Sequence, residues 1–165
     1  MAYSIEKHLA YNEWANTKVA DVLRAVEDQV FFQDNKSSFP SIAKTVLHIW
    51  DAQHIWLQRM QGNSLSTWPS AKFRGSKDDS LNGLIHSSSD LSEFMRAKKK
   101  SFLSTVYPYK NIKGDPFEGT YEDTLFHVVN HSTYHRGQII TMLRESGSTL
   151  LPSTDLIHYL RALKK

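Results

Sequence analysis

Four long segments of the chain place apolar residues at intervals of three or four, the spacing that gathers them on one face of an α-helix. These segments cover residues 4–28, 40–61, 78–104 and 120–146. In the first segment the stripe is formed by Ile5, Leu9, Asn12, Ala15, Val19, Val22 and Val26. Four long amphipathic helices in one chain predict an all-α fold whose architecture is a four-helix bundle.

Local signals predict where these helices begin and end. Ser4 is expected to cap the first helix, and Pro40 to occupy the first turn of the second. Thr120 with Asp123 three residues later has the pattern of a capping pair, and Gly147 suits the end of the fourth helix. The second segment is apolar on most of its faces, which predicts a central place in the bundle.

The connections are also distinctive. Residues 64–77 contain a Trp-Pro pair and a glycine and are expected to form a long loop. Residues 105–119 predict an extended crossover, in the form of a short hairpin, before the fourth long helix. A short C-terminal helix is expected at 154–163. Because no repeat or low-complexity linker interrupts the chain, residues 1–165 are expected to form a single domain.

Composition excludes several classes of function. The chain has no cysteine, so disulfides, cysteine-ligated metals and a thiol nucleophile are absent. A net charge of +3 with one short basic run at 96–100 does not favour a nucleic-acid partner. No apolar run reaches the roughly 18 residues that cross a membrane. The N-terminus lacks the pattern of a secretory signal, so a cytoplasmic location is expected.

Two of the eight histidines stand out because His131 and His135 are four residues apart in the fourth predicted helix. Their Cβ atoms should lie about 6 Å apart, on the apolar face that also carries Val128 and Ile139. An unsatisfied imidazole in a core costs about 1–3 kcal/mol. The pair therefore either binds a metal ion or consists of two core histidines that hydrogen-bond a buried carbonyl or hydroxyl.

A third ligand has to come from another helix. His48, in the second predicted helix, is the better candidate, although a core histidine is also compatible with its position. His54 lies about 240° further round the helix and cannot face the same site. Asp51, about one turn beyond His48, is a candidate to orient a ligand or move a proton. His127 shares the stripe of His131 and is interpreted as a packing or supporting residue.

The residues that follow His135 are expected to lie off the metal-binding face. Arg136 and Gln138 are about 100° and 300° round the helix from His135. Arg136 is therefore predicted to form an ion pair between helices. Gly137 is predicted to allow a neighbouring helix to approach closely, which would justify its cost of about 1 kcal/mol relative to alanine.

Three motifs give the chain a family resemblance: residues 11–16 (YNEWAN), 47–52 (LHIWDA) and, most specifically, 127–138 (HVVNHSTYHRGQ). In order and separation they resemble the DinB-like family of bacterial helical bundles, which includes thiol-dependent transferases and a maleylpyruvate isomerase. The resemblance implies a metal ion near one end of the bundle, with His48, His131 and His135 as ligands. It also implies zinc or nickel as the metal and a homodimer. Gln53 stands where the family often has glutamate.

Three imidazoles without a thiolate are typical of catalytic zinc, which keeps one coordination position open. The first hypothesis is therefore a metal-dependent enzyme for a small-molecule substrate, either a hydrolase or a transferase with a low-molecular-weight thiol as cosubstrate. Thiol transfer is implied by the resemblance alone. A second hypothesis is a non-catalytic, metal-containing stress-response or ligand-binding protein. In a third, the histidines only join two helices.

Overall fold

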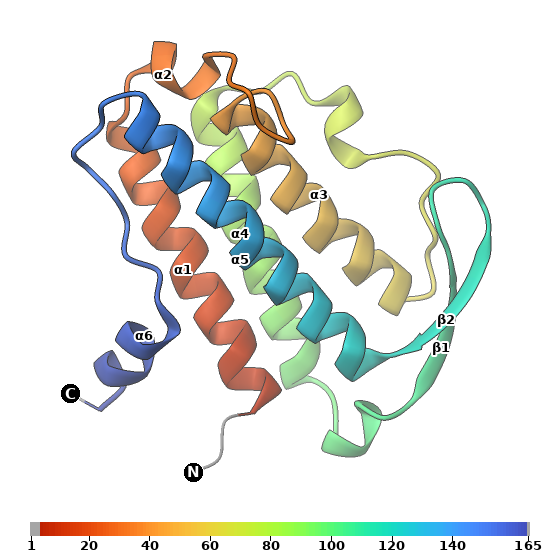
Figure 1. Ribbon diagram of the computed structural model, residues 1–165. Helices are drawn as coiled ribbons and strands as arrows, with labels where there is room; N and C mark the ends of the chain where they lie inside the picture. The colour runs from red at the N-terminus through yellow and green to blue at the C-terminus, as the bar shows by residue number, and fades with distance from the viewer. Residues whose placement is uncertain (1–3, 165) are drawn as a thin grey trace.

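The four predicted segments form the four long helices of a bundle in the computed structural model, which describes residues 4–164 (Figure 1). These helices are α1 (Ile5–Ala25), α3 (Ile42–Met60), α4 (Lys77–Arg96) and α5 (Tyr121–Glu145). Two short helices, α2 (Asp28–Phe32) and α6 (Leu156–Ala162), lie outside the bundle proper. None of the helices within residues 4–164 is long and apolar enough to cross a membrane.

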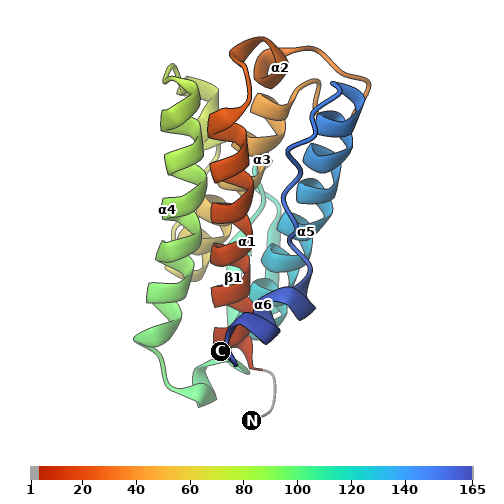
Figure 2. The same ribbon diagram turned by 90° about the vertical axis from the view of Figure 1, so that its left-hand side faces the viewer.

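The order of the helices explains the long loop. Helices α1 and α5 run in one direction and α3 and α4 in the other, and α1 packs against both α4 and α5 (Figures 1 and 2). Because the consecutive helices α3 and α4 are parallel neighbours, the chain must return along the whole bundle between them. A helix of 19 residues is about 28 Å long. Residues 61–76 cover that distance and include the 3₁₀ turn η1 (Pro69–Lys72).

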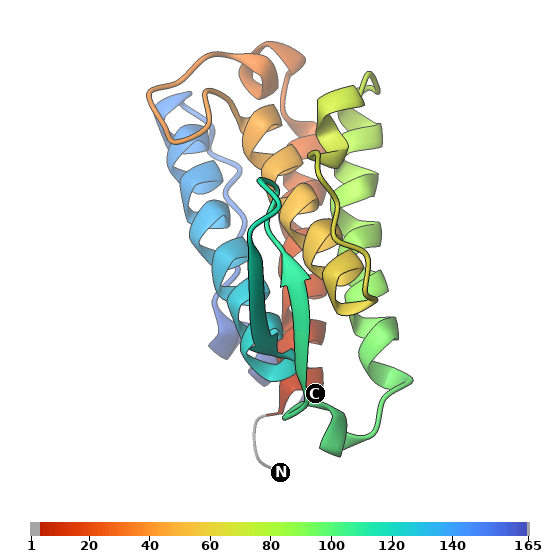
Figure 3. The same cartoon turned by 90° about the vertical axis from the view of Figure 1, so that its right-hand side faces the viewer.

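The predicted crossover is a two-stranded antiparallel hairpin of β1 (Val106–Lys110) and β2 (Pro116–Thr120). Its turn is closed by the Asn111 side chain, which accepts hydrogen bonds from the backbone of Lys113 and Asp115. The hairpin lies alongside one end of α3 and α5, with β1 in contact with α3 and β2 in contact with α5 (Figure 3). There Tyr109 packs against Trp56 of α3, with ring centroids 5.1 Å apart.

Several predicted helix ends are confirmed. The Ser4 side chain accepts a hydrogen bond from the Lys7 N–H, and Thr120 accepts one from the Asp123 N–H. Gly147 follows α5 with a φ of 82°, which is unfavourable for other residues. The prediction for Pro40 is wrong. Helix α3 begins at Ile42, because the side chain of Ser41 provides the cap.

Two predicted helices are shorter than expected. Helix α1 ends at Ala25, where the next residue, Val26, takes an extended conformation. The Lys77 ammonium donates a hydrogen bond of 2.7 Å to the Val26 carbonyl, and it thereby satisfies a backbone acceptor at the helix end. Helix α4 ends at Arg96, and a 3₁₀ turn, η2 (Lys100–Phe102), follows. The apolar pattern continues past both ends because these turns also pack on the bundle.

Helix α3, which is apolar on most of its faces, contacts α4, α5, η1, α2 and β1, in agreement with the predicted central place. Its apolar residues that face away from the bundle are covered by the two long connections. Trp50 packs against Phe73 of the loop between α3 and α4, and Trp56 packs against the hairpin. Gly83 of α4 accommodates Trp50, because a Cβ at that glycine would lie 2.7 Å from the indole ring.

The core consists of two apolar clusters with a buried polar layer between them. One cluster contains Leu23, Ile49 and Leu84, and the other contains Leu9, Leu57 and Leu91. The polar layer joins all four long helices through side-chain hydrogen bonds, and its members are Asn12, Asn16, Gln53, Ser87, Ser88 and Arg136.

Candidate metal centre

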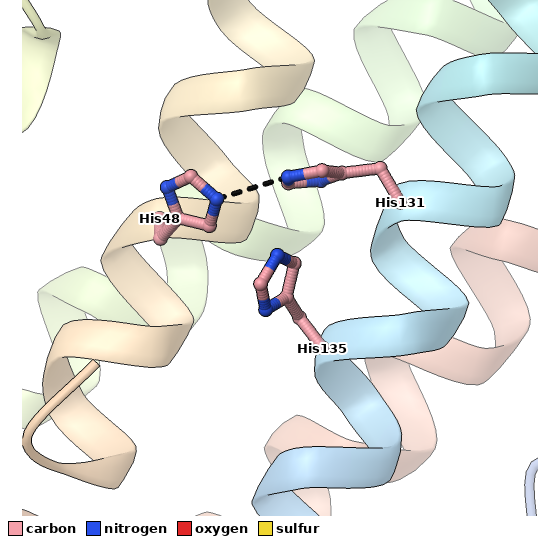
Figure 4. Close-up of side chains that lie close together, drawn as sticks. All are labelled: His48, His131 and His135. Carbon is pink, nitrogen blue, oxygen red and sulfur yellow. Dashed lines mark hydrogen bonds between the residues drawn. The ribbon is translucent and has the colours of Figure 1, made fainter. Parts of the chain in front are cut away.

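Three histidines from two helices converge between α3 and α5 (Figure 4). His48 comes from α3, and His131 and His135 come from successive turns of α5. One ring nitrogen of each residue lies within 4.8 Å of the corresponding nitrogens of the other two. This is the set of residues that the sequence analysis selected, and a metal ion placed among them would contact all three.

The closest approach within this group joins Nε2 of His48 to Nε2 of His131, at 2.9 Å. Two ring nitrogens at this distance must share one proton, so only one of them can be a donor. Two imidazoles on one tetrahedral zinc ion have their nitrogens about 3.3 Å apart, given bond lengths of about 2.0–2.1 Å. His48 and His131 would therefore separate by a few tenths of an ångström to hold a metal in place of the proton, and the third nitrogen, that of His135, lies within 4.8 Å of theirs.

His135 is oriented by a neighbour on its own helix. Its Nδ1 donates a hydrogen bond of 2.7 Å to Oε1 of Gln138, which leaves the lone pair of Nε2 free. The amide of Gln138 also donates to the hydroxyl of Ser38 at 3.1 Å. Such a partner fixes the tautomer and ring orientation of a metal-binding histidine. Nδ1 of His131, in contrast, is buried and has no hydrogen-bond partner within residues 4–164.

Burial keeps the three imidazoles neutral, which is the form that binds metals. Burial and the neighbouring His135 lower the pKa of His48 to about 4. Burial and the adjacent histidines lower the pKa of His131 to about 3. The pKa of His135 is also lowered by burial, and its hydrogen bond with Gln138 partly offsets this effect. The donor set therefore fits a divalent transition metal ion.

Asp51 is buried on α3 and binds the loop that follows this helix. Its carboxylate accepts hydrogen bonds from the backbone N–H of Ser70, at 2.8 Å, and from the Ser70 hydroxyl. Burial raises the pKa of Asp51, and the two bonds from Ser70 oppose this rise. Asp51 is not one of the three clustered ligands, but it fixes η1 against α3 beside His48.

A pocket of about 350 Å³ adjoins His48, a size typical of small-ligand sites. Phe39 stacks on the His48 ring at a centroid distance of 4.0 Å, and the Trp68 ring lies 6.2 Å from it. The apolar part of the pocket's lining consists of Phe39, Pro40, Leu47, Trp68 and Ala71. Its polar and charged residues are Lys44, His48, Asp51 and Ser70.

The other candidate histidines lie away from the cluster. His127 packs its ring against Trp56 at a centroid distance of 5.3 Å and lies 5.9 Å from His131, in agreement with a packing role. His54 lines a separate depression between α3 and α4. Its position confirms that His48 and His54 face different parts of the molecule.

The predictions for Arg136 and Gly137 need correction. Arg136 does join helices, but its partners are amides rather than a carboxylate: it donates to Oδ1 of Asn12 and of Asn16, each at 2.8 Å. These bonds connect the first motif to the third. A Cβ at Gly137 would meet no atom within 4 Å, so no helix approaches there. The close approach in this fold occurs at Gly83.

Gln138 is the main residue that the sequence analysis missed. A helical wheel places it about 300° from His135, but residues three apart on a helix are neighbours whose side chains can meet. This rule, applied to the third motif, predicts the hydrogen bond between His135 and Gln138.

The sequence analysis also missed three residues of the pocket: Phe39, Lys44 and Ser70. Phe39 and Ser70 lie in connections whose conformation has no sequence signature.

The model of the DinB family matches residues 1–163. The chain belongs to the DinB family. A relative, the protein DinB of Bacillus subtilis strain 168, is 31% identical over 158 residues, which cover 91% of this chain and 90% of that protein. These matches confirm the resemblance indicated by the three motifs.

Two solved structures confirm the fold. A DinB-like protein from Bacillus cereus ATCC 10987 has a TM-score of 0.64 at 19% identity, over 87% of this chain and 91% of that one. YfiT from Bacillus subtilis has a TM-score of 0.69 at 15% identity, over 90% of this chain and 92% of that one. YfiT is described as a probable metal-dependent hydrolase with an unusual four-helix bundle topology.

Proposed function

We propose that this protein is a metal-dependent enzyme that holds one divalent ion, zinc or nickel, with His48, His131 and His135. The observation that carries the proposal is the convergence of three neutral imidazoles beside a pocket of about 350 Å³. A structural metal site would be closed by a fourth protein ligand, usually cysteine. Neither a cysteine nor a fourth clustered ligand is found within residues 4–164. The description of YfiT as a probable metal-dependent hydrolase agrees with this choice.

The reaction class that we propose is hydrolysis or the transfer of a low-molecular-weight thiol to a small electrophile. A metal bound by three histidines supplies an open position that lowers the pKa of water or of a thiol. Phe39 and Trp68 lie beside the His48 ring and form apolar walls of the pocket. Asp51 is the carboxylate of the pocket lining, and we assign it to proton movement or ligand orientation in partnership with Ser70. The homodimer implied by the family and the cytoplasmic location expected from the sequence belong to the same proposal.

Metal analysis of protein purified without a metal-affinity tag tests this function. We expect about one equivalent of a single divalent metal, and its loss in the His48→Ala and His135→Ala variants. His54→Ala is the matched control, because His54 lies on the same helix but outside the cluster, and it should retain the metal. Absence of metal after reconstitution with zinc or nickel would contradict the proposal.

A second reading is favoured by one observation, the 2.9 Å hydrogen bond between His48 and His131, which by itself joins α3 to α5. In that reading the histidines are structural. Chelation and one substitution separate the two readings. An enzyme should lose activity on chelation and retain its helical signal at 25 °C. If the histidines join the helices through their own hydrogen bond, chelation should leave the thermal stability unchanged, whereas His131→Ala should lower it.

A further inference from the structure

The pocket beside His48 contains one charged group that has no bonding partner within residues 4–164. The ammonium of Lys44 takes part in no ion pair or side-chain hydrogen bond among them. Asp51, the other charged residue of the lining, is bound through both carboxylate oxygens to Ser70. A ligand in this pocket therefore meets a free positive charge and an occupied negative one, which favours an anion.

The walls of the same pocket favour a flat apolar body. Phe39 lies nearly parallel to the His48 ring, at an interplanar angle of 25°, and forms one aromatic surface. Trp68 is another lining residue, and its side chain is 44% exposed although it is large and apolar. Aromatic rings pack favourably in offset or edge-to-face arrangements against such surfaces.

The order of the polar groups along α3 sets the orientation of this ligand. Lys44, His48 and Asp51 follow one another at intervals of four and three residues, so they share one face of the helix. Lys44 and His48 are about 6 Å apart along the helix axis, and Asp51 is about 4.5 Å further on. An anionic group placed at Lys44 is thus kept away from the Asp51 carboxylate.

We propose that this pocket binds small aromatic carboxylates, with the carboxylate at Lys44, the ring against Phe39 and Trp68, and a reacting substituent facing His48. The identification of this ligand as the substrate class rests on the proposed function. The binding itself rests only on the pocket and can be measured without metal.

Benzoate is the simplest probe of this proposal, and benzyl alcohol is its uncharged counterpart. The full chain, freed of metal by a chelator, is titrated with each probe while the indole N–H resonances of its four tryptophans are followed. The Trp68 resonance is assigned with a Trp68→Phe variant. We expect benzoate to shift the Trp68 resonance in a saturable manner, and benzyl alcohol to bind at least about fivefold more weakly.

Two lysine variants locate the charge contact. Lys44→Gln should weaken benzoate binding about fivefold, the effect of losing one solvent-accessible charge pair, and should leave benzyl alcohol binding unchanged. Lys72→Gln is the matched control, because Lys72 lies on η1 but does not line the pocket, and it should bind benzoate like the parent chain. Equal benzoate affinity in the two variants, or an unmoved Trp68 resonance, would overturn the proposal.

The outcome is independent of the metal analysis. A chain that binds benzoate at Lys44 but never takes up metal refutes the proposed enzyme and retains this binding site. A chain that holds one metal ion but gives no Lys44-dependent benzoate binding retains the metal site and refutes this ligand class.

Discussion

The Nδ1 atom of His135 donates a 2.7 Å hydrogen bond to Oε1 of Gln138, and the amide of Gln138 in turn donates to Ser38. One side chain thus connects a candidate metal ligand to the segment between α2 and α3. The same segment carries Phe39, which stacks on His48. The orientation of the His135 ring and the position of the pocket wall are therefore coupled through Gln138.

Replacement of Gln138 by leucine should weaken metal binding by about 10–100-fold, the usual effect of removing the partner of a metal-binding histidine. The helix should remain folded, because Gln138 is only partly buried. Competition with a chromogenic chelator measures the affinity, and circular dichroism checks the fold.

Two further variants make the Gln138 result interpretable. Gln138→Glu keeps an acceptor for the His135 Nδ1–H and should retain most of the affinity. Gln61→Leu changes an exposed glutamine beyond the end of α3 and should have no effect. A Gln138→Leu variant with parental metal affinity would show that the hydrogen bond does not support the site.

Asn12 holds the centre of the buried polar layer. Its Oδ1 accepts a hydrogen bond from Arg136 at 2.8 Å, and its Nδ2 donates to Gln53 at 2.7 Å. Asn12→Ala removes both hydrogen bonds at once. The buried guanidinium of Arg136 then has one amide acceptor fewer. We expect the free energy of unfolding to fall by about 2–4 kcal/mol, as for other buried polar groups that lose their partners.

Urea denaturation measures this change, and Asn130→Ala is the control. Asn130 is exposed on α5, so the same chemical replacement there should alter the free energy of unfolding by less than about 0.5 kcal/mol. Equal effects of the two variants would mean that the polar layer contributes little to stability.

The polar layer shows how far the sequence could predict the site. The spacing of His131 and His135 is a property of one helix, so it identified two candidate ligands directly. The third motif also indicated that Arg136 lies between helices. Periodicity placed Asn12 on the apolar stripe of α1, but it does not show which helix that stripe packs against, so Asn12 and Asn16 could not be inferred as the partners of Arg136.

The connections limited the prediction more than the helices did. Helical periodicity located α1, α3, α4 and α5, although the ends of two of them were misjudged where capping is tertiary, as between Lys77 and the Val26 carbonyl. The pocket depends on Phe39, Trp68 and Ser70, which belong to two connections between helices. The positions of Trp68 and Ser70 follow from the parallel arrangement of α3 and α4, whereas Phe39 is placed by the connection between α2 and α3. No local pattern encodes either connection.

Two helical glycines should respond in opposite ways to alanine. At Gly83 a Cβ would lie 2.7 Å from rigid ring atoms of Trp50, so Gly83→Ala should lower the free energy of unfolding by about 1–2 kcal/mol through overpacking. At Gly137 a Cβ meets nothing within 4 Å, so Gly137→Ala should raise it by about 0.5–1 kcal/mol through helix propensity. Thermal denaturation of both variants measures these changes as shifts of the melting temperature. Shifts of the same sign in the two variants would contradict the packing described for Trp50.

The stability of the metal-free protein should depend on pH through His48 and His131. Their pKa values in the folded protein, about 4 and about 3, lie below the value of about 6.5 expected in the unfolded chain. Between these limits the unfolded chain binds protons that the folded protein does not bind. Stability should therefore be complete above pH 6.5 and decrease as the pH falls toward 4.

Urea denaturation of metal-free protein at pH 7.5, 6.0 and 5.0 measures this dependence. His131→Asn removes the histidine whose pKa is most strongly lowered, so the loss of stability between pH 7.5 and 5.0 should be smaller in that variant than in the parent chain. His86→Asn changes an exposed histidine of α4 and should keep the parental dependence. If both variants lose stability as steeply as the parent, the pH dependence originates in groups other than His131, and burial does not hold His131 neutral.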